Sequence, residues 1–195
     1  MERKSGGQKE SGDGGCAIKS QLGGPIELVI CINFYLYRSI KNNNLHPQQM
    51  DLFNDEYFMR RALQEAEQAF REGEVPVGAV VVSQNRIIAV AHNLTETLTD
   101  VTAHAEMQAI TAAANLLGGK YLNECTLYVT IEPCVMCAGA LGWAQIGKIV
   151  YGAPDEKRGF RRFAPAALHP KTEVVHGVLE HECAAVVKEF FQKKR

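Results

Sequence analysis

Apolar residues recur at helical spacing in several segments of the chain, with polar residues between them. After Asn54, a residue type that caps helices, this pattern continues to Gly73 and predicts a helix. A second helical pattern follows Thr102, which we expect to be the cap, and it stops at Gly118 with His104 in its first turn. Two more helices are predicted over residues 133–144 and 180–194.

Short β-branched runs predict strands between these helices. Val77–Val82 and Ile87–Ala91 flank a turn at Gln84–Asn85, a pattern typical of an antiparallel hairpin. Further strands are predicted at Thr126–Ile131, Lys148–Gly152 and Glu173–Val178. The order of strands and helices indicates an α/β protein whose sheet is covered by helices on both faces.

The first 49 residues differ from the rest of the chain. Residues 1–24 are rich in Gly, Ser, Lys and Glu and lack a hydrophobic period, so we expect disorder there. The apolar run 26–37 is too short to span a bilayer, and the residues after it make a poor signal-peptide cleavage site. We expect residues 1–49 to be a dispensable extension, with Met50 as the working start and residues 50–195 as the domain. The alternative is that the apolar run packs on the domain as an extra helix or strand.

Composition, net charge and cysteine count limit the classes of protein that this sequence fits. The chain has 195 residues, of which 46% are hydrophobic and 22% charged, as is typical of one globular domain. The formal net charge is -1, so any attraction to a nucleic acid has to be local. Six cysteines in a chain of this length do not require a disulfide framework, which favours a reducing compartment, the cytoplasm. Cys125 and Cys183 fit buried positions.

The candidate chemistry lies in two short motifs, His104-Ala105-Glu106 and Pro133-Cys134-Val135-Met136-Cys137. One imidazole and two thiols would give a zinc ion three protein ligands and an open fourth position, as in catalytic rather than structural zinc sites. Cys134 and Cys137 are three residues apart near a predicted helix start, so their sulfurs share one face, and the helix dipole favours thiolates there.

Glu106 lies two residues after His104, and on a helix such neighbours do not face the same way. We therefore expect different roles: His104 binds the metal, and Glu106 carries protons to and from the water in the open position. This set suits hydrolytic loss of ammonia from an amidine-like carbon of a nucleobase. Taken singly, H-x-E also occurs at ordinary helix starts, and C-x-x-C in redox sites or structural fingers. Their combination at a strand–helix junction favours the catalytic interpretation.

From Asp55 to Arg195 the chain resembles the bacterial tRNA-specific adenosine deaminases of the cytidine deaminase superfamily. The resemblance rests on the two motifs and on the segments Val75–Val80, His92–Asn93, Thr102–Glu106 and Thr126–Ala140. It implies a three-layer α/β/α fold with a five-stranded mixed sheet, a homodimer, and conversion of the wobble adenosine of tRNA to inosine.

The resemblance also implies roles for single residues. By it, His104, Cys134 and Cys137 bind one zinc per subunit, Glu106 is the proton donor, Asn93 and the backbone of Ala105 contact the flipped base, and Asp155 is a further substrate contact. Asn93 also fits a simple turn residue that closes a strand.

The substrate class stays open at this point. Guanine deaminases share both motifs, so a free base or nucleoside is an alternative substrate. A lumazine-pathway deaminase is disfavoured, because its two cysteines stand much further apart than Cys134 and Cys137. A zinc-stabilised RNA-binding module is the non-enzymatic alternative, and it would have no use for Glu106.

Basic and aromatic residues gather in the loop 155–163 and at the end of the last helix. Proteins bind RNA loops, such as the anticodon loop of tRNA, with Lys and Arg on phosphates and aromatic rings on splayed bases. The candidate RNA contacts are Arg161, Arg162, Phe191, Lys193 and Lys194. Alternatively, the charges only face solvent and Phe191 packs in the core. The loop departs from the family pattern, since Lys157–Arg162 replaces a Lys-Thr-Gly-Ala-Ala-Gly-like tract.

Overall fold

The computed structural model describes residues 53–194, and the predictions for residues 1–49 lie outside this range. The elements in chain order are α2 (Asp55–Arg71), β1 (Gly78–Ser83), β2 (Arg86–His92), α3 (Ala105–Leu117), β3 (Cys125–Ile131), α4 (Val135–Trp143), β4 (Lys148–Ala153), α5 (Phe160–Phe163), β5 (Glu173–His176) and α6 (Glu180–Lys193). Within the described range, no helix is both long and apolar enough to cross a membrane.

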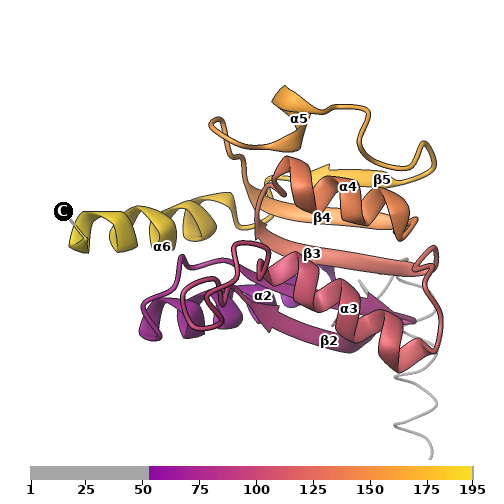
Figure 1. Cartoon of the computed structure of the whole chain (residues 1–195), viewed down its shortest axis with the longest axis horizontal. Coiled ribbons are helices and arrows are strands. Elements are labelled where there is room, and N and C mark those ends of the chain that lie inside the picture. The colour runs from indigo at the N-terminus through magenta and orange to yellow at the C-terminus, as the bar shows by residue number, and fades with distance from the viewer. Residues whose placement is uncertain (1–52, 195) are drawn as a thin grey trace, which may run out of the picture. The chain divides into compact units, whose positions relative to one another are not determined.

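The strands form one mixed sheet in the order β2-β1-β3-β4-β5 (Figure 1). β1 runs antiparallel to both β2 and β3, whereas β3, β4 and β5 are parallel to one another. The hairpin turn at Gln84 and Asn85 has positive φ values of 49° and 59°, as a tight two-residue hairpin requires. The five-stranded mixed sheet and its hairpin are confirmed.

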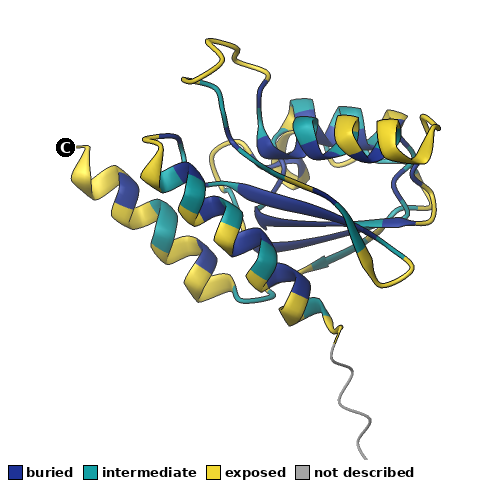
Figure 2. Ribbon diagram, turned by 90° about the horizontal axis from the view of Figure 1, so that it is seen from below, coloured by how far each residue is buried: buried dark blue, intermediate teal, exposed yellow. Residues whose placement is uncertain are grey.

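Helices cover both faces of the sheet, as predicted. On one face, the alanines of α3 and Leu141 of α4 pack against Val81, Leu127 and Val129. On the other face, α2 and α6 pack against the alternate strand residues, such as Val80, whose side chains point to that side of the sheet. The buried positions of the helices therefore form stripes toward the sheet (Figure 2). This is the three-layer α/β/α arrangement.

The helix starts differ from the prediction in a way that matters for the site. Asn54 caps α2 as expected, accepting a hydrogen bond from the Tyr57 backbone N–H at 2.9 Å. Thr102 does not cap α3, because its hydroxyl donates to Asp100 at 2.7 Å, and the extended N-cap residue is His104. The prediction that His104 lies in the first turn was therefore wrong by one position.

The same shift occurs at α4, which begins at Val135 rather than at Pro133, with the extended residue Cys134 as its N-cap. The end of β5 also differs from the prediction. β5 ends at His176 instead of Val178, because Gly177 turns the chain with a φ of 86°. Gly118 ends α3 in the left-handed conformation, as the sequence predicted.

Candidate active site

Two helix N-termini meet at one side of the sheet, and both N-cap residues carry a metal-binding side chain. His104 is the N-cap of α3, Cys134 is the N-cap of α4, and Cys137 lies in the first turn of α4. The Nδ1 atom of His104 lies 3.7 Å from Sγ of Cys134 and 3.5 Å from Sγ of Cys137. Residues separated by 30 positions or more in the sequence are thus brought into direct contact.

These three side chains fit a metal ion. Their ligand atoms all lie within 4.8 Å of one another, and among the described residues they form the one such group of three. In a tetrahedral site with Zn–S near 2.3 Å and Zn–N near 2.05 Å, nitrogen and sulfur are about 3.6 Å apart. The two nitrogen–sulfur distances match this spacing, and the described residues add no fourth protein ligand to the group.

The local electrostatics favour a thiolate at Cys134. Hydrogen bonds from the Cys137 thiol and from His104 lower the pKa of Cys134 to about 4. The same contact with Cys134 raises the pKa of His104, so this imidazole would have to release its proton to bind a metal. The Cys137 thiol donates toward Cys134, which raises the pKa of Cys137. Of the three side chains, Cys134 is therefore the one most favoured in its metal-binding form, the thiolate.

Glu106 lies in the first turn of α3 beside the Cys137 thiol, and 4% of its surface is exposed. Burial is the main cause that raises the pKa of its carboxyl group. A carboxyl group with a raised pKa both accepts and releases a proton more readily near neutral pH. The neighbouring Ala105 is fully buried.

Asn93 follows β2 and is held by a carboxylate that sequence reasoning missed. Its Nδ2 donates to Glu74 at 3.0 Å and to the Thr95 hydroxyl at 2.9 Å. Glu74 is fully buried and also accepts the backbone N–H groups of Glu96 and Thr97 at 3.2 and 2.7 Å. A glutamate next to an apolar strand was the only sequence signal for this role, and such residues are usually exposed.

Asp155 follows β4 and shapes the loop beside α4. Its Oδ1 accepts the backbone N–H groups of Lys157 and Arg158 at 2.9 and 3.1 Å. Gly159 forms an antiparallel bridge with Cys134, so the loop lies directly beside the metal-binding group. The short helix α5 within this loop was not predicted.

The remaining candidate RNA contacts lie in two places. Arg161 and Arg162 are exposed on α5. On α6, Phe190 takes the buried position and Phe191 is 48% exposed, so the alternative that Phe191 packs in the core is wrong. The ammonium group of Lys194 donates to the Gly73 backbone oxygen at 3.2 Å, and Lys193 pairs with Glu189. The end of α6 therefore lies beside the segment that carries Glu74.

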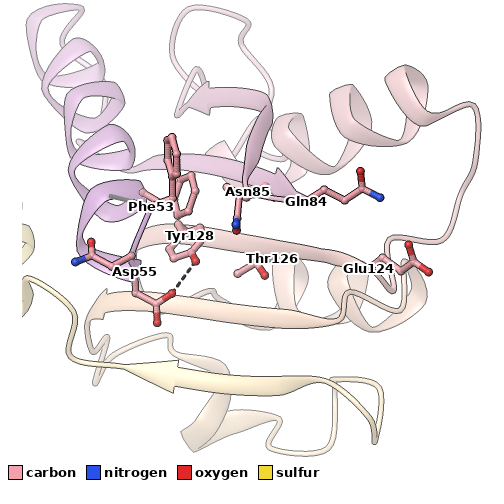
Figure 3. Close-up of a pocket in the computed structure, with 10 residues that line it drawn as sticks. Phe53, Asp55, Gln84, Asn85, Glu124, Thr126 and Tyr128 are labelled. Carbon is pink, nitrogen blue, oxygen red and sulfur yellow. Dashed lines mark hydrogen bonds between the residues drawn. The ribbon is translucent and has the colours of Figure 1, made fainter. Parts of the chain in front are cut away.

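A cavity of about 400 Å³ opens elsewhere, between the start of α2, the β1–β2 turn and the start of β3 (Figure 3). Its wall contains Tyr128, whose hydroxyl donates to Asp55 at 2.7 Å, and Lys148 pairs with the same carboxylate at 3.4 Å. None of the candidate site residues lines it. Within this wall, the hydrogen bond between Tyr128 and Asp55 joins α2 to β3.

Comparison with known proteins decides the family. The model of the MafB19-like deaminase family matches residues 53–195. A tRNA-specific adenosine deaminase from Aquifex aeolicus is 46% identical over 145 residues, which cover 72% of this chain and 95% of that protein. The chain belongs to the tRNA-specific adenosine deaminase family.

Solved structures agree with this membership. In work on A-to-I editing by tRNA:A34 deaminases, a structure with 44% sequence identity superposes with a TM-score of 0.63, covering 67% of this chain and 98% of that one. A guanine deaminase from Bacillus subtilis is 42% identical with a TM-score of 0.50, but it covers only 52% of this chain and 65% of that one. The cytidine deaminase-like fold is confirmed, and the tRNA-specific adenosine deaminases match over the greater length.

Proposed function

We propose that this chain is a zinc-dependent tRNA adenosine deaminase that converts the wobble adenosine of the anticodon loop to inosine. The support is its family membership together with one structural observation: a buried carboxyl group, Glu106, stands beside a group of three metal-binding side chains. A purely structural zinc site would have four protein ligands and no need for this carboxyl group.

In this proposal each residue has a defined task. His104, Cys134 and Cys137 would hold the zinc ion, which would supply a Lewis acid to lower the pKa of a water molecule toward neutrality. Glu106 would take one proton of the attacking water and give it to a ring nitrogen of the base, and would then take the proton of the newly added hydroxyl and give it to the amino group, which leaves as ammonia. Its raised pKa suits both directions of transfer.

The substrate is held by other groups. The Asn93 amide, fixed by Glu74, and the backbone of Ala105 would contact the flipped base, and Asp155 would be a further substrate contact. Extruding a base from its stack requires compensating contacts, which Arg161, Arg162, Phe191, Lys193 and Lys194 would supply on phosphates and bases.

The substrate class is tested by offering an anticodon stem-loop with a wobble adenosine and free guanine side by side. We expect inosine in the stem-loop and no xanthine, both measured by mass spectrometry of digested products. Xanthine without inosine would instead support a guanine deaminase, the alternative that the similarity to the Bacillus subtilis enzyme suggests.

We also propose a homodimer. Val135 and Trp143 lie on one side of α4, eight residues apart, and are 43% and 87% exposed. A nearly fully exposed tryptophan on an apolar helix is typical of a contact surface. Light scattering should give twice the chain mass, and Trp143→Glu should give a monomer, whereas Tyr121→Glu, at another exposed aromatic residue, should leave the dimer intact.

Finally, we propose that residues 50–195 are the working domain and that the protein acts in the cytoplasm. The family match begins at residue 53, and the four cysteines of the described range are free thiols, which suits a reducing compartment. Deleting residues 1–49 should leave deamination and thermal stability unchanged. A marked loss of either would contradict the domain boundary.

A further inference from the structure

One buried carboxylate close to the site has no task in the mechanism above. Glu132 lies between β3 and α4, two residues before Cys134, and only 4% of its side chain is exposed. Its Oε2 accepts the backbone N–H of Asp155 at 3.1 Å, and its Oε1 accepts that of Arg161 at 3.0 Å. One side chain therefore fastens both ends of the loop 155–161.

The backbone of this loop is fastened to the same segment. Cys134 and Gly159 form an antiparallel bridge, and the Phe160 N–H donates to the Pro133 oxygen at 3.0 Å. A Cβ atom on Gly159 would lie 2.4 Å from the Asp155 backbone oxygen and 2.5 Å from Cδ of Glu132. Only glycine allows the loop to approach this closely.

The fastened loop carries the groups that the proposed function assigns to substrate. Asp155, Arg161 and Arg162 surround a hollow of about 380 Å³ whose floor includes Glu132. The position of the loop relative to the metal-binding group therefore depends on Glu132.

We propose that Glu132 is a positioning residue that holds the loop 155–161 against the Pro133–Cys134 segment, so that the loop meets the substrate in one fixed conformation. The anchoring follows from contacts within the chain alone, whereas its effect on RNA binding rests on the proposed function. The two parts are therefore tested separately.

Anchoring is tested by limited trypsin digestion of the full chain and of Glu132→Gln. A glutamine offers one acceptor oxygen, and its NH₂ group would face the second backbone N–H. Cleavage after Lys157 and Arg158 should become about tenfold faster, because a local opening costs less once a hydrogen bond to a charged acceptor is lost. Cleavage after Lys120, an exposed residue in another turn, should keep its rate.

Two further variants distinguish the effect of the Glu132 carboxylate from the effects of Arg161 and Gly159, which contact it. Arg161→Ala removes the 3.6 Å ion pair with Glu132 but keeps the backbone hydrogen bond, so cleavage after Lys157 should stay slow. Gly159→Ala leaves the carboxylate intact and forces the loop away, so cleavage there should become fast. Unchanged cleavage after Lys157 in Glu132→Gln, or equal acceleration after Lys157 and Lys120, would overturn the proposal.

The effect on substrate is measured with the anticodon stem-loop. Glu132→Gln should raise KM about tenfold with a smaller change in kcat, because the loop supplies binding rather than chemistry, and the zinc content should stay at one per chain. A fall in kcat with unchanged KM would overturn the positioning role. A chain without any deaminase activity would refute the proposed function, while the digestion result would still decide the anchoring.

Discussion

Glu106 and Glu74 are both buried glutamates near the proposed site, with 4% and 0% of their surfaces exposed, but their surroundings differ. Burial dominates at Glu106 and raises the pKa of its carboxyl group. At Glu74 burial also opposes ionisation, yet hydrogen bonds from the Thr97 and Glu96 backbone and from the Thr95 side chain outweigh it, so the pKa is lowered. A carboxyl group with few donors is suited to moving protons, whereas one saturated with donors is suited to holding a loop.

The same contrast, between a carboxyl group with few hydrogen-bond donors and one with many, distinguishes the metal-binding group from the loops beside it. In the proposed function, the metal-binding group at the starts of α3 and α4, whose N-cap residues make no side-chain capping hydrogen bond, would supply the chemistry. The loops beside it, fastened by Glu74 and Glu132, would bind the substrate. Changes in the first region should remove turnover, and changes in the second should weaken binding or stability.

The largest effect is expected at the cysteines. Cys137→Ser should lose the bound zinc and with it all measurable inosine formation, since a neutral hydroxyl is a poor zinc ligand. Cys125→Ser changes another buried cysteine that lies outside the metal group, and it should keep one zinc per chain. Zinc is measured by atomic emission on the purified proteins. Full zinc content in Cys137→Ser would remove this residue from the site.

Glu74→Gln should be costly for stability rather than for chemistry. Glutamine cannot accept all four hydrogen bonds, so the free energy of unfolding at pH 7 should fall by about 2–3 kcal/mol. Because the folded pKa of Glu74 lies below its ordinary value of 4.5, this difference should be full above pH 4.5 and shrink as pH falls through the folded pKa. Urea unfolding at pH 7 and pH 3.5 measures it. A constant difference would mean that Glu74 is not ionised in the folded chain.

The smallest effects are expected from surface charges. Replacing Arg161 and Arg162, or Lys193 and Lys194, with glutamine should weaken stem-loop binding by about tenfold and lower the slope of log K against log salt by about 1.5. The matched control replaces Arg86 and Lys120, two exposed cations elsewhere. Fluorescence anisotropy at several salt concentrations provides the slopes. Equal slopes in all variants would show that these charges only face solvent.

Most of the fold could be predicted from sequence, because the relevant signals are local. Asn54 before an amphipathic run and the Gln84–Asn85 turn each specify an element with few alternatives. The starts of α3 and α4 were misplaced because Thr102 bonds to Asp100 and because Pro133 stays outside its helix. These helix starts depend on side-chain hydrogen bonds and tertiary packing, which the helical spacing of apolar residues does not reveal.

Only part of the candidate site could be predicted from the sequence, because only part of it depends on local signals. His104, Cys134 and Cys137 share a chemistry that their residue types reveal, and the structure brings them together. Glu74 and Glu132 look like ordinary surface glutamates in the sequence. Their importance depends on backbone N–H groups 22 to 29 residues away, which only the folded chain places beside them.

The most direct test of the central claim, that Glu106 moves the proton while the three metal-binding side chains hold the ion, is inosine formation by Glu106→Gln loaded with one zinc per chain. Glutamine has the same size but cannot exchange a proton, so the single-turnover rate should fall by at least about a hundredfold, with zinc content and thermal stability retained. A rate within a few fold of the unaltered chain would contradict the account.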